Sequence, residues 1–151
     1  CTAQAAMEIL DFYGVDPAGK KAAVIGRSLV VGRPVSMMLM HKNATVTTCH
    51  TKTVDMPSIT KEADILIVCA GKMESIGAEY IKEGQVVIDV GIGWNEEKGK
   101  LCGDVKFEEA EPVAGAITPV PGGVGAVTTS VLLSHVVAAA KRAANAEKSS
   151  K

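Results

Sequence analysis

The stretch AAVIGRSLVVGRP, residues 22–34, decides the fold. An apolar run leads into Gly26, and a second glycine, Gly32, stands just before Pro34. A short apolar run that ends in glycine indicates a buried strand, and proline is tolerated in the first turn of a helix. We therefore predict a strand at residues 22–26, a glycine-bearing turn, and a helix at residues 34–42.

The same alternation continues along the chain. Strands are predicted at residues 44–49, 65–69, 86–90 and 116–118, helices at residues 2–13, 58–63 and 128–144, a helical turn at residues 77–83 and an extended piece at residues 99–107. Continuous apolar strands separated by helices predict a parallel sheet that is covered on both faces and joined by right-handed crossovers. The expected fold class is α/β, a Rossmann-like doubly wound parallel sheet flanked by helices.

Composition excludes several classes of protein. The 151 residues include 16 basic and 17 acidic ones and only 3% aromatic ones, so neither a basic stripe nor a stacking platform for nucleic acid is expected. The apolar run at residues 131–140 is interrupted by Ser134 and His135 and falls short of the ~20 residues of a membrane span. The N-terminal residues do not resemble a signal peptide. The four cysteines form neither a CxxC pair nor a metal-binding pattern, which favours reduced thiols in the cytoplasm and no metal site.

The turn after the first strand occupies the place of a phosphate-binding loop. Gly26 permits a tight turn, and Gly32 lets the start of the helix approach a phosphate, which the helix N-terminus attracts. The candidate cofactor-binding residues here are Gly26, Arg27, Ser28, Gly32 and Arg33. The alternative is an ordinary glycine-rich turn.

The end of the second strand favours NADP over NAD. NAD-binding folds of this class place an acid there for the ribose 2′-hydroxyl, whereas this chain has His50, Thr51 and Lys52. These side chains, with the guanidinium of Arg27, suit a 2′-phosphate. The alternative for His50 and Lys52 is a solvated loop.

Small residues follow the third and fourth strands. Ala70, Gly71 and Gly91 would let the nicotinamide end of a cofactor approach the backbone. Asp89 is assigned no paired-carboxylate role, and Asp104 is interpreted as an isolated acid that serves a turn or a cap.

The stretch TPVPGGVGAVT, residues 118–128, places rigid and permissive residues together. Its prolines stiffen the loop and its glycines permit close approach of a ligand, while Thr128 is expected to cap the following helix. A plain turn is the alternative. The candidate substrate-side residues are Pro121, Gly122, Gly123, Val124 and Gly125.

In order, the segments VIGRSLVVGRP, ATVTTCHTKT, ADILIVCAGK, VVIDVGIG, GDVKF and ITPVPGGVG resemble the bifunctional methylenetetrahydrofolate dehydrogenase/methenyltetrahydrofolate cyclohydrolase family, over residues 1 to about 142. The resemblance implies that 5,10-methylenetetrahydrofolate is oxidised by hydride transfer to NADP and then hydrolysed to 10-formyltetrahydrofolate. It also implies roles for residues that match the family pattern. Gly26, Arg27 and Ser28 match the phosphate site, Thr51 the 2′-phosphate, Ile92 the nicotinamide end, and the three glycines of residues 122–125 the cofactor–folate junction; Thr128 is included with the cofactor residues.

The family's Tyr-x-x-x-Lys pair and catalytic Asp belong to a preceding domain. Here Tyr13 is followed by Pro17 and Tyr80 by Gly84, so neither supplies the lysine. We therefore expect no catalytic residue in this chain, about 120 further residues upstream, and little or no activity of the chain alone.

The expected organisation is a connecting helix at residues 1–14, the NADP-binding domain at residues 15–127, a bridging helix at residues 128–144 and a flexible tail at residues 145–151. Tetrahydrofolate derivatives would bind through the other domain, and the full-length protein would be a cytoplasmic homodimer. Two alternatives are a stand-alone NADP-binding regulatory or scaffolding module and another NADP-dependent dehydrogenase with the same half-fold.

Overall fold

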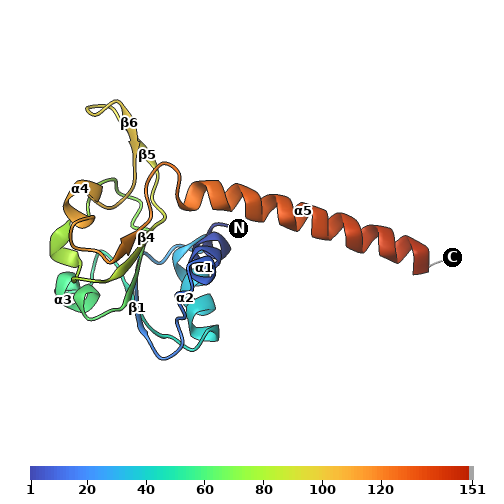
Figure 1. Cartoon of the computed structure of the whole chain (residues 1–151), viewed down its shortest axis with the longest axis horizontal. Coiled ribbons are helices and arrows are strands. Elements are labelled where there is room, and N and C mark those ends of the chain that lie inside the picture. The colour runs from blue at the N-terminus through green and yellow to red at the C-terminus, as the bar shows by residue number, and fades with distance from the viewer. Residues whose placement is uncertain (150–151) are drawn as a thin grey trace.

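Five parallel strands form a sheet at the centre of the chain, and helices cover both of its faces (Figure 1). The computed structural model describes residues 1–149. The strand order is β2-β1-β3-β4-β7, and β5 and β6 form a separate antiparallel hairpin. The elements are α1 (Thr2–Phe12), β1 (Lys21–Ile25), α2 (Gly32–His41), β2 (Thr45–Cys49), α3 (Met56–Lys61), β3 (Ile65–Val68), the 3-10 helix η1 (Ala78–Tyr80), β4 (Val86–Asp89), β5 (Gly93–Asn95), β6 (Lys100–Cys102), α4 (Phe107–Ala110), β7 (Ala116–Ile117) and α5 (Val124–Ser149).

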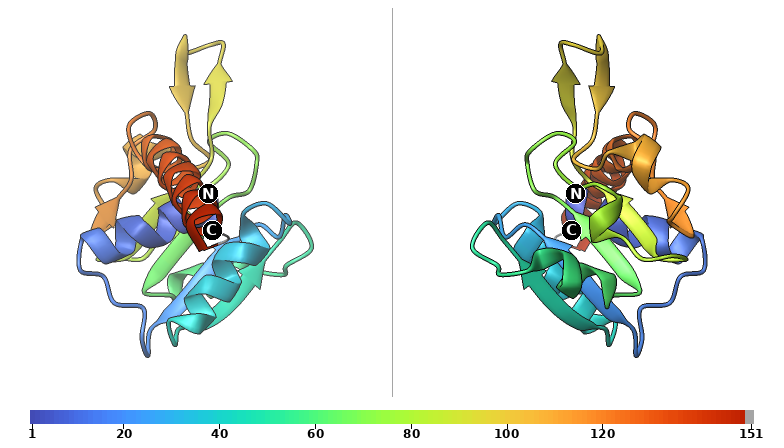
Figure 2. Two further views of the ribbon diagram at one scale, coloured as in Figure 1. Left: turned by 90° about the vertical axis from the view of Figure 1, so that its right-hand side faces the viewer. Right: turned by 90° about the vertical axis from the view of Figure 1, so that its left-hand side faces the viewer.

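The central strands divide their side chains between two hydrophobic clusters. Val24 and Ile67 face the first cluster, which α1, α2 and the start of α5 cover. Ile25 and Val68 face the second, beneath α3, η1 and α4. Figure 2 shows these two groups of helices on opposite sides of the sheet. Burial on both faces explains why β1 and β3 are continuously apolar, and it confirms the predicted α/β fold.

Most predicted elements lie where the sequence placed them. The five sheet strands and the first three helices differ from the predicted ranges by no more than two residues at either end. β6 lies within the predicted extended piece at residues 99–107, but β5, its pairing with β6 in the hairpin that projects from the body in Figure 1, and the short helix α4 were not predicted. Helix α5 begins at Val124 rather than at residue 128, and it continues through most of the expected flexible tail to Ser149. The last two residues of that tail lie outside the described residues.

The two terminal helices differ in their surroundings. Helix α1 buries Ala6 and Leu10 in the first cluster and therefore belongs to the core of this domain. Helix α5 packs against α1 near its start, where Val131 is buried, and then extends away from the body (Figure 1). Beyond that point Leu133 and Val136 are 61% and 57% exposed.

The length of α5 corrects one expectation. Ser134 and His135 interrupt the apolar run in the sequence but not the helix, and Val124–Ala146 is long and apolar enough to cross a membrane by length and composition alone. This is weak evidence for a span, because helices of water-soluble domains meet the same criterion.

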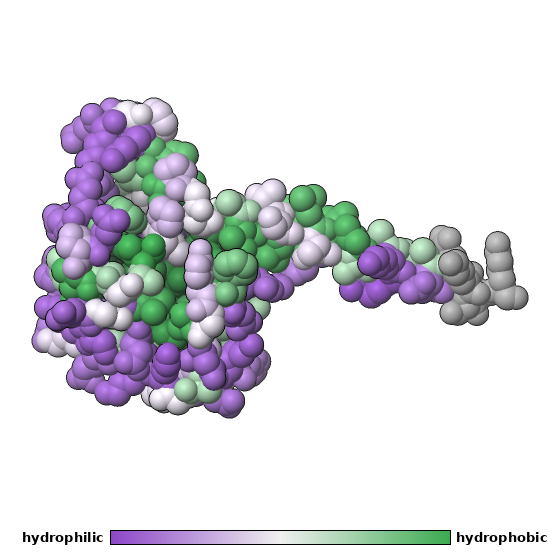
Figure 3. Space-filling view, in the orientation of Figure 1, coloured by the Kyte–Doolittle hydropathy of each residue, from purple (hydrophilic) through white to green (hydrophobic). Residues whose placement is uncertain are grey.

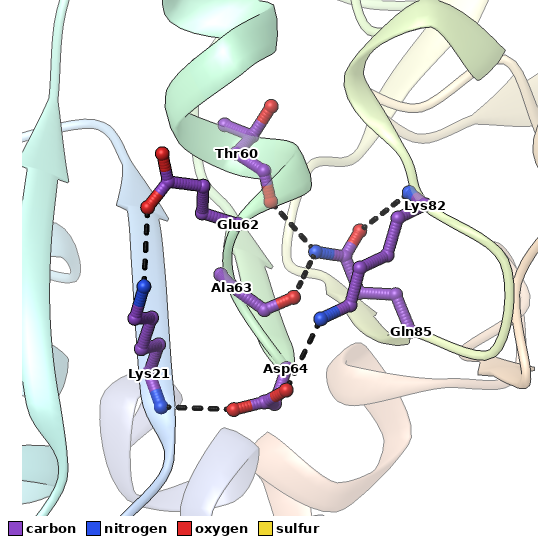
Figure 4. Close-up of polar contacts among 7 residues, drawn as sticks. All are labelled: Lys21, Thr60, Glu62, Ala63, Asp64, Lys82 and Gln85. Carbon is purple, nitrogen blue, oxygen red and sulfur yellow. Dashed lines mark hydrogen bonds and ion pairs between the residues drawn. The ribbon is translucent and has the colours of Figure 1, made fainter.

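A polar cluster ties together the amino-terminal ends of the strands (Figure 4). The amide of the fully buried Gln85 donates to the carbonyl oxygens of Thr60 and Ala63, at 2.7 and 2.8 Å. Asp64 accepts the backbone N–H of Lys21 at 3.0 Å and the ammonium of Lys82 at 3.1 Å. These bonds hold the pKa of Asp64 below its ordinary value and join the starts of β1, β3 and β4.

Candidate functional site

The carboxyl ends of the central strands lie level with one another. Ile25, the last residue of β1, pairs with Cys49 of β2 and with Val68 of β3, and Val68 pairs with Asp89 of β4. The loops that follow these strands therefore leave the same edge of the sheet, where open α/β folds bind ligands. In the order β2-β1-β3-β4-β7 the chain direction across the sheet reverses between β1 and β3, so the expected crevice lies there.

The turn after β1 is shaped by two glycines. Gly26 has φ of +126°, and a Cβ there would collide with the carbonyl oxygen of Cys69 on the neighbouring strand. The predicted tight turn is therefore confirmed. Gly32 is buried, and a Cβ there would collide with the carbonyl oxygen of Gly26. The small size of Gly32 thus lets the start of α2 pack onto the turn. The role predicted from the sequence was different, namely to let the start of the helix approach a phosphate.

The polar groups of this turn place the start of α2 at the crevice. Ser28 accepts the N–H of Val31 on its hydroxyl at 3.1 Å and the N–H of Arg33 on its carbonyl at 3.0 Å. The side chain of Arg33 donates to the carbonyl of Arg27 at 3.1 Å. The side chains of Arg27 and Ser28 are exposed, and within the described residues no side chain caps α2. A helix start without a side-chain cap, next to the exposed Arg27, is suited to binding an anion.

The end of β2 forms a tight turn beside it. The N–H of Lys52 donates to Nδ1 of His50 at 3.1 Å, and the N–H of His50 donates to the hydroxyl of Thr53 at 2.9 Å. An imidazole that accepts this bond has no proton on Nδ1, so a neutral ring carries its proton on Nε2. Thr51 and Lys52 are exposed. No acid stands in this turn, as the sequence analysis noted.

Two buried carboxylates, Asp89 at the end of β4 and Asp104 in the loop after β6, have roles that differ from those predicted. Asp104 is 2% exposed and accepts the N–H of Gly71 at 2.7 Å. It lies next to Asp89, which accepts the N–H of Asp104 itself at 3.1 Å. Asp104 is therefore not an isolated acid in a turn, and Asp89 does have a carboxylate neighbour. The signal in the sequence was indirect: glycines at 91 and 103 flank the two acids.

Burial dominates the electrostatics of this pair. It raises the pKa of Asp89 to about 6, and the charge of Asp104 adds to the rise, although three backbone N–H groups favour the charged form. Burial, followed by the charge of Asp104, also raises the pKa of the Cys69 thiol to about 11. Cys69 is thus an unreactive thiol at the end of β3.

The predicted nicotinamide rim is in part a packing device. Gly91 makes room for the carboxylate of Asp104, because a Cβ there would collide with it. Around Gly71, with φ of +70°, the space beside the backbone is open, and Ala70 is exposed. Ile92 is 64% exposed, which leaves its side chain available to a ligand.

The loop from Thr118 to the start of α5 lies at the same edge. The hydroxyl of Thr118 accepts the N–H of Asp89 at 2.8 Å, and the Val120-Pro121 peptide bond is cis. A Cβ at Gly123 would collide with the carbonyl oxygen of Pro119, so the packing of the loop requires a glycine here. Gly122, with φ of +97°, has open space beside it, as does Gly125.

Two assignments around the start of α5 change. Thr128 is not a cap, because it lies within the helix and its hydroxyl donates to the carbonyl of Val124 at 2.8 Å. Val124 is buried in the first hydrophobic cluster and is a packing residue.

Two cavities adjoin this edge. The first, of about 320 Å³, lies between the end of β4 and the β5–β6 hairpin and is lined by Asp89, Cys102 and Val120 among others. The second, of about 730 Å³, is a mostly apolar groove between α1, the β4–β7 pair and the start of α5, lined in part by Gly122 and Gly123. Apolar side chains gather on this part of the surface in Figure 3. Among the described residues, no three His, Cys, Asp or Glu side chains are grouped to hold a metal ion.

Comparison with known proteins places this geometry in one group. Residues 1–144 match the family described as "Tetrahydrofolate dehydrogenase/cyclohydrolase, NAD(P)-binding domain". The chain is 55% identical over 142 residues to "Bifunctional protein FolD" of Clostridium botulinum (strain Okra / Type B1), covering 94% of this chain and 50% of the relative. The chain therefore spans half the length of that relative.

Solved structures agree. The bifunctional FolD enzyme from Campylobacter jejuni has a TM-score of 0.90 and 46% identity, over 94% of this chain and 50% of that one. The FolD enzyme from Trypanosoma brucei, described as complexed with NADP cofactor and inhibitor, has a TM-score of 0.87 and 42% identity, over 95% of this chain and 50% of that one.

Proposed function

Because the chain belongs to the tetrahydrofolate dehydrogenase/cyclohydrolase family and is its NAD(P)-binding domain, we propose that it binds NADP for a bifunctional enzyme of one-carbon metabolism. In that enzyme 5,10-methylenetetrahydrofolate gives up a hydride to the nicotinamide ring, and the resulting 5,10-methenyl cation is hydrolysed to 10-formyltetrahydrofolate. The other half of such an enzyme would supply the general acid and base. The alternative of a stand-alone regulatory or scaffolding module receives no support from the comparisons.

The carboxyl edge of the sheet offers a place for each part of the cofactor. The turn at Gly26 and the uncapped start of α2 suit the diphosphate. The acid-free end of β2, where Thr51 and Lys52 are exposed, adjoins the end of β1 that leads to Arg27, and these residues suit a 2′-phosphate. The exposed Ile92 and the open backbone at Gly71 suit the nicotinamide end.

The single observation that carries the proposal is the alignment of these loops. The four strand ends are level in the sheet register, so residues far apart in the sequence meet at one edge. The fit of these residues to NADP supports the cofactor assignment, as does the NADP held by the similar enzyme from Trypanosoma brucei.

The remaining parts of the proposal concern the whole protein. The exposed apolar side chains of Leu133 and Val136 on α5, and of Phe12 at the end of α1, suit contact with the other half of the enzyme. The groove between α1 and the start of α5 would then lie where the two halves meet, and tetrahydrofolate derivatives would bind at that junction. Assembly as a homodimer, a cytoplasmic location and a place in purine biosynthesis belong to this same proposal.

Calorimetric titration with NADP and NAD tests the cofactor assignment. Removal of a charge-assisted phosphate contact costs about 1.5–3 kcal/mol, so Lys52→Ala should weaken NADP binding roughly 10- to 100-fold. Binding of NAD, which lacks the 2′-phosphate, should change less than about two-fold. Lys61→Ala, which removes an exposed lysine from α3, is the matched control and should leave both affinities unchanged. Equal losses for the two cofactors in Lys52→Ala, or tighter binding of NAD by the wild-type chain, would contradict the assignment.

A further inference from the structure

Two carboxylates are buried side by side where the ends of β3 and β4 meet the loop after β6. Asp89 is 3% exposed and Asp104 is 2% exposed. The backbone around them is shaped to admit them. A Cβ at Gly91 would collide with the carboxylate of Asp104, and a Cβ at Gly103 would collide with the carboxylate of Asp89. Burial of a carboxylate costs free energy unless hydrogen-bond donors surround it, so we expect N–H groups to bond this pair.

Asp89 holds the loop that carries Asp104. Its Oδ1 accepts the N–H of Gly91 at 2.9 Å and the N–H of Asp104 at 3.1 Å, and its Oδ2 accepts the N–H of Val105 at 2.9 Å. Its own N–H donates to the hydroxyl of Thr118 at 2.8 Å. The end of β4 is therefore bonded both to the loop after β6 and to the loop that leads into α5.

Asp104 passes this constraint on to the end of β3. Its Oδ2 accepts the N–H of Gly71 at 2.7 Å, at the short end of the usual range for a bond from nitrogen to oxygen. Gly71 has a positive φ and follows the exposed Ala70. A positive φ is a conformation that only glycine adopts easily, and the bond from Asp104 helps to hold the loop after β3 in it.

We propose that Asp104 is a positioning residue for the nicotinamide half of the cofactor, because its carboxylate holds the loop after β3 against the crevice while Asp89 holds Asp104. This inference rests on the proposed function, and it assigns neither carboxylate a bond to the ligand. Asp104 acts through Gly71 on one part of the cofactor only.

The strand order explains why only one half of the cofactor is affected. β2 and β3 lie on opposite sides of β1. The end of β2, with Thr51 and Lys52, suits the 2′-phosphate of the adenosine half. A dinucleotide that crosses the end of β1 then places its nicotinamide half over β3 and β4, where the two carboxylates lie. A ligand that ends at the adenosine half does not reach Gly71.

Two probes separate this role from a contribution to stability. NADPH spans the whole crevice, whereas adenosine 2′,5′-bisphosphate represents the adenosine half alone. We expect Asp104→Ala to weaken NADPH at least about 10-fold and the bisphosphate less than about two-fold. Asp104→Asn keeps a neutral acceptor of the same shape, so it should weaken NADPH only about three- to five-fold.

The matched control is Asp64→Ala. Asp64 also accepts a backbone N–H, from Lys21 at 3.0 Å, but it lies at the opposite edge of the same sheet (Figure 4). This variant should lower the melting temperature and leave both affinities unchanged. A loss of stability alone therefore cannot produce the expected change in the ratio of the two affinities.

The outcomes divide cleanly. If Asp104→Ala weakens both probes equally, or neither, Asp104 does not position the nicotinamide half, and the inference is overturned while the proposed function stands. If the wild-type chain binds neither probe, the proposed function fails and the inference fails with it. If Asp104→Ala does not fold, Asp104→Asn decides, because unchanged NADPH affinity in that variant overturns the inference.

Discussion

Replacement of Gln85 by methionine should destabilise the domain without changing its affinity for the cofactor. Gln85 is fully buried, and its amide donates to the carbonyl oxygens of Thr60 and Ala63 at 2.7 and 2.8 Å, where α3 ends (Figure 4). The carbonyl groups in the last turn of a helix have no partner within the helix. Gln85→Met keeps the length of the side chain and removes both donors.

The magnitude follows from the two acceptors. A buried polar group left without a partner costs about 1–3 kcal/mol. The carbonyl of Thr60 also accepts the N–H of Ala63 at 3.2 Å, so its loss is smaller than that of the Ala63 carbonyl. The apolar methionine returns about 1 kcal/mol through its buried surface. The net loss should be about 2–4 kcal/mol, or a fall in melting temperature of roughly 5–15 °C for a domain of this size.

Urea unfolding followed by circular dichroism measures this change, and the slope with urea shows whether unfolding stays two-state. Gln4→Met is the control, because the bonds of the Gln4 side chain, to Glu8 on α1 and to His135 on α5, are both exposed and their loss should cost less than about 1 kcal/mol. NADPH affinity should be unchanged in both variants, since Gln85 lies at the edge of the sheet opposite the crevice. The reasoning fails if Gln85→Met is as stable as Gln4→Met.

Two further predictions concern the carboxyl edge. Gly26→Ala should lower the free energy of unfolding by about 2–6 kcal/mol, because φ of +126° strains any side chain and the Cβ meets the Cys69 carbonyl. Gly14→Ala, with φ of +68° and open space, should lower it by only about 1 kcal/mol. Similar losses for the two variants in urea unfolding would show that the collision at Gly26 costs little. Because burial raises the pKa of Asp89 from 3.8 to about 6, protonation favours the folded state, and this contribution is lost as pH rises through about 6. Asp89→Asn should therefore gain about 2 kcal/mol relative to wild type between about pH 4.5 and about pH 7.5, and a constant difference would refute the shift.

The sheet could be predicted because its signal is local. Val24 and Ile67 lie within short apolar runs bounded by glycine or by polar residues, and such runs have few alternatives to a buried strand. The β5–β6 hairpin lacked this signal. Its strands have three residues each, they include the exposed Trp94, and they pair only with each other. Pairing of this kind depends on contacts between the strands, which the pattern of apolar residues in the sequence does not predict.

The start of α5 was misplaced for a related reason. The sequence GGVG before it has low helix propensity, so Thr128 looked like the natural cap. In the structure Val124 is buried in the core, and its burial fixes the first turn of the helix four residues earlier. Tertiary packing thus overrides the local preference.

The candidate site could be predicted only in part for the same reason. Arg27 and Lys52 could be proposed as cofactor residues from the sequence because each follows a predicted strand, and both are exposed in the structure. Asp104 was misjudged because its partners, Asp89 and Gly71, are 15 and 33 residues away in the sequence. The packing role of Gly123 could not be predicted, because the atom that a side chain there would meet, the Pro119 carbonyl oxygen, is brought near only in the folded loop.

The two edges of the sheet differ in what their polar residues bind. At the amino-terminal edge, Gln85 and Asp64 place their polar atoms on partners within the chain. At the carboxyl edge, Arg27 and Lys52 have exposed side chains, while the buried carboxylate of Asp104 holds the backbone of Gly71 after β3. A change at the first edge should therefore appear in the unfolding free energy and a change in the exposed residues of the second in the cofactor affinity. Asp104 is buried at the second edge, so its loss should lower the unfolding free energy and also weaken the binding of NADPH, while the binding of adenosine 2′,5′-bisphosphate stays nearly unchanged.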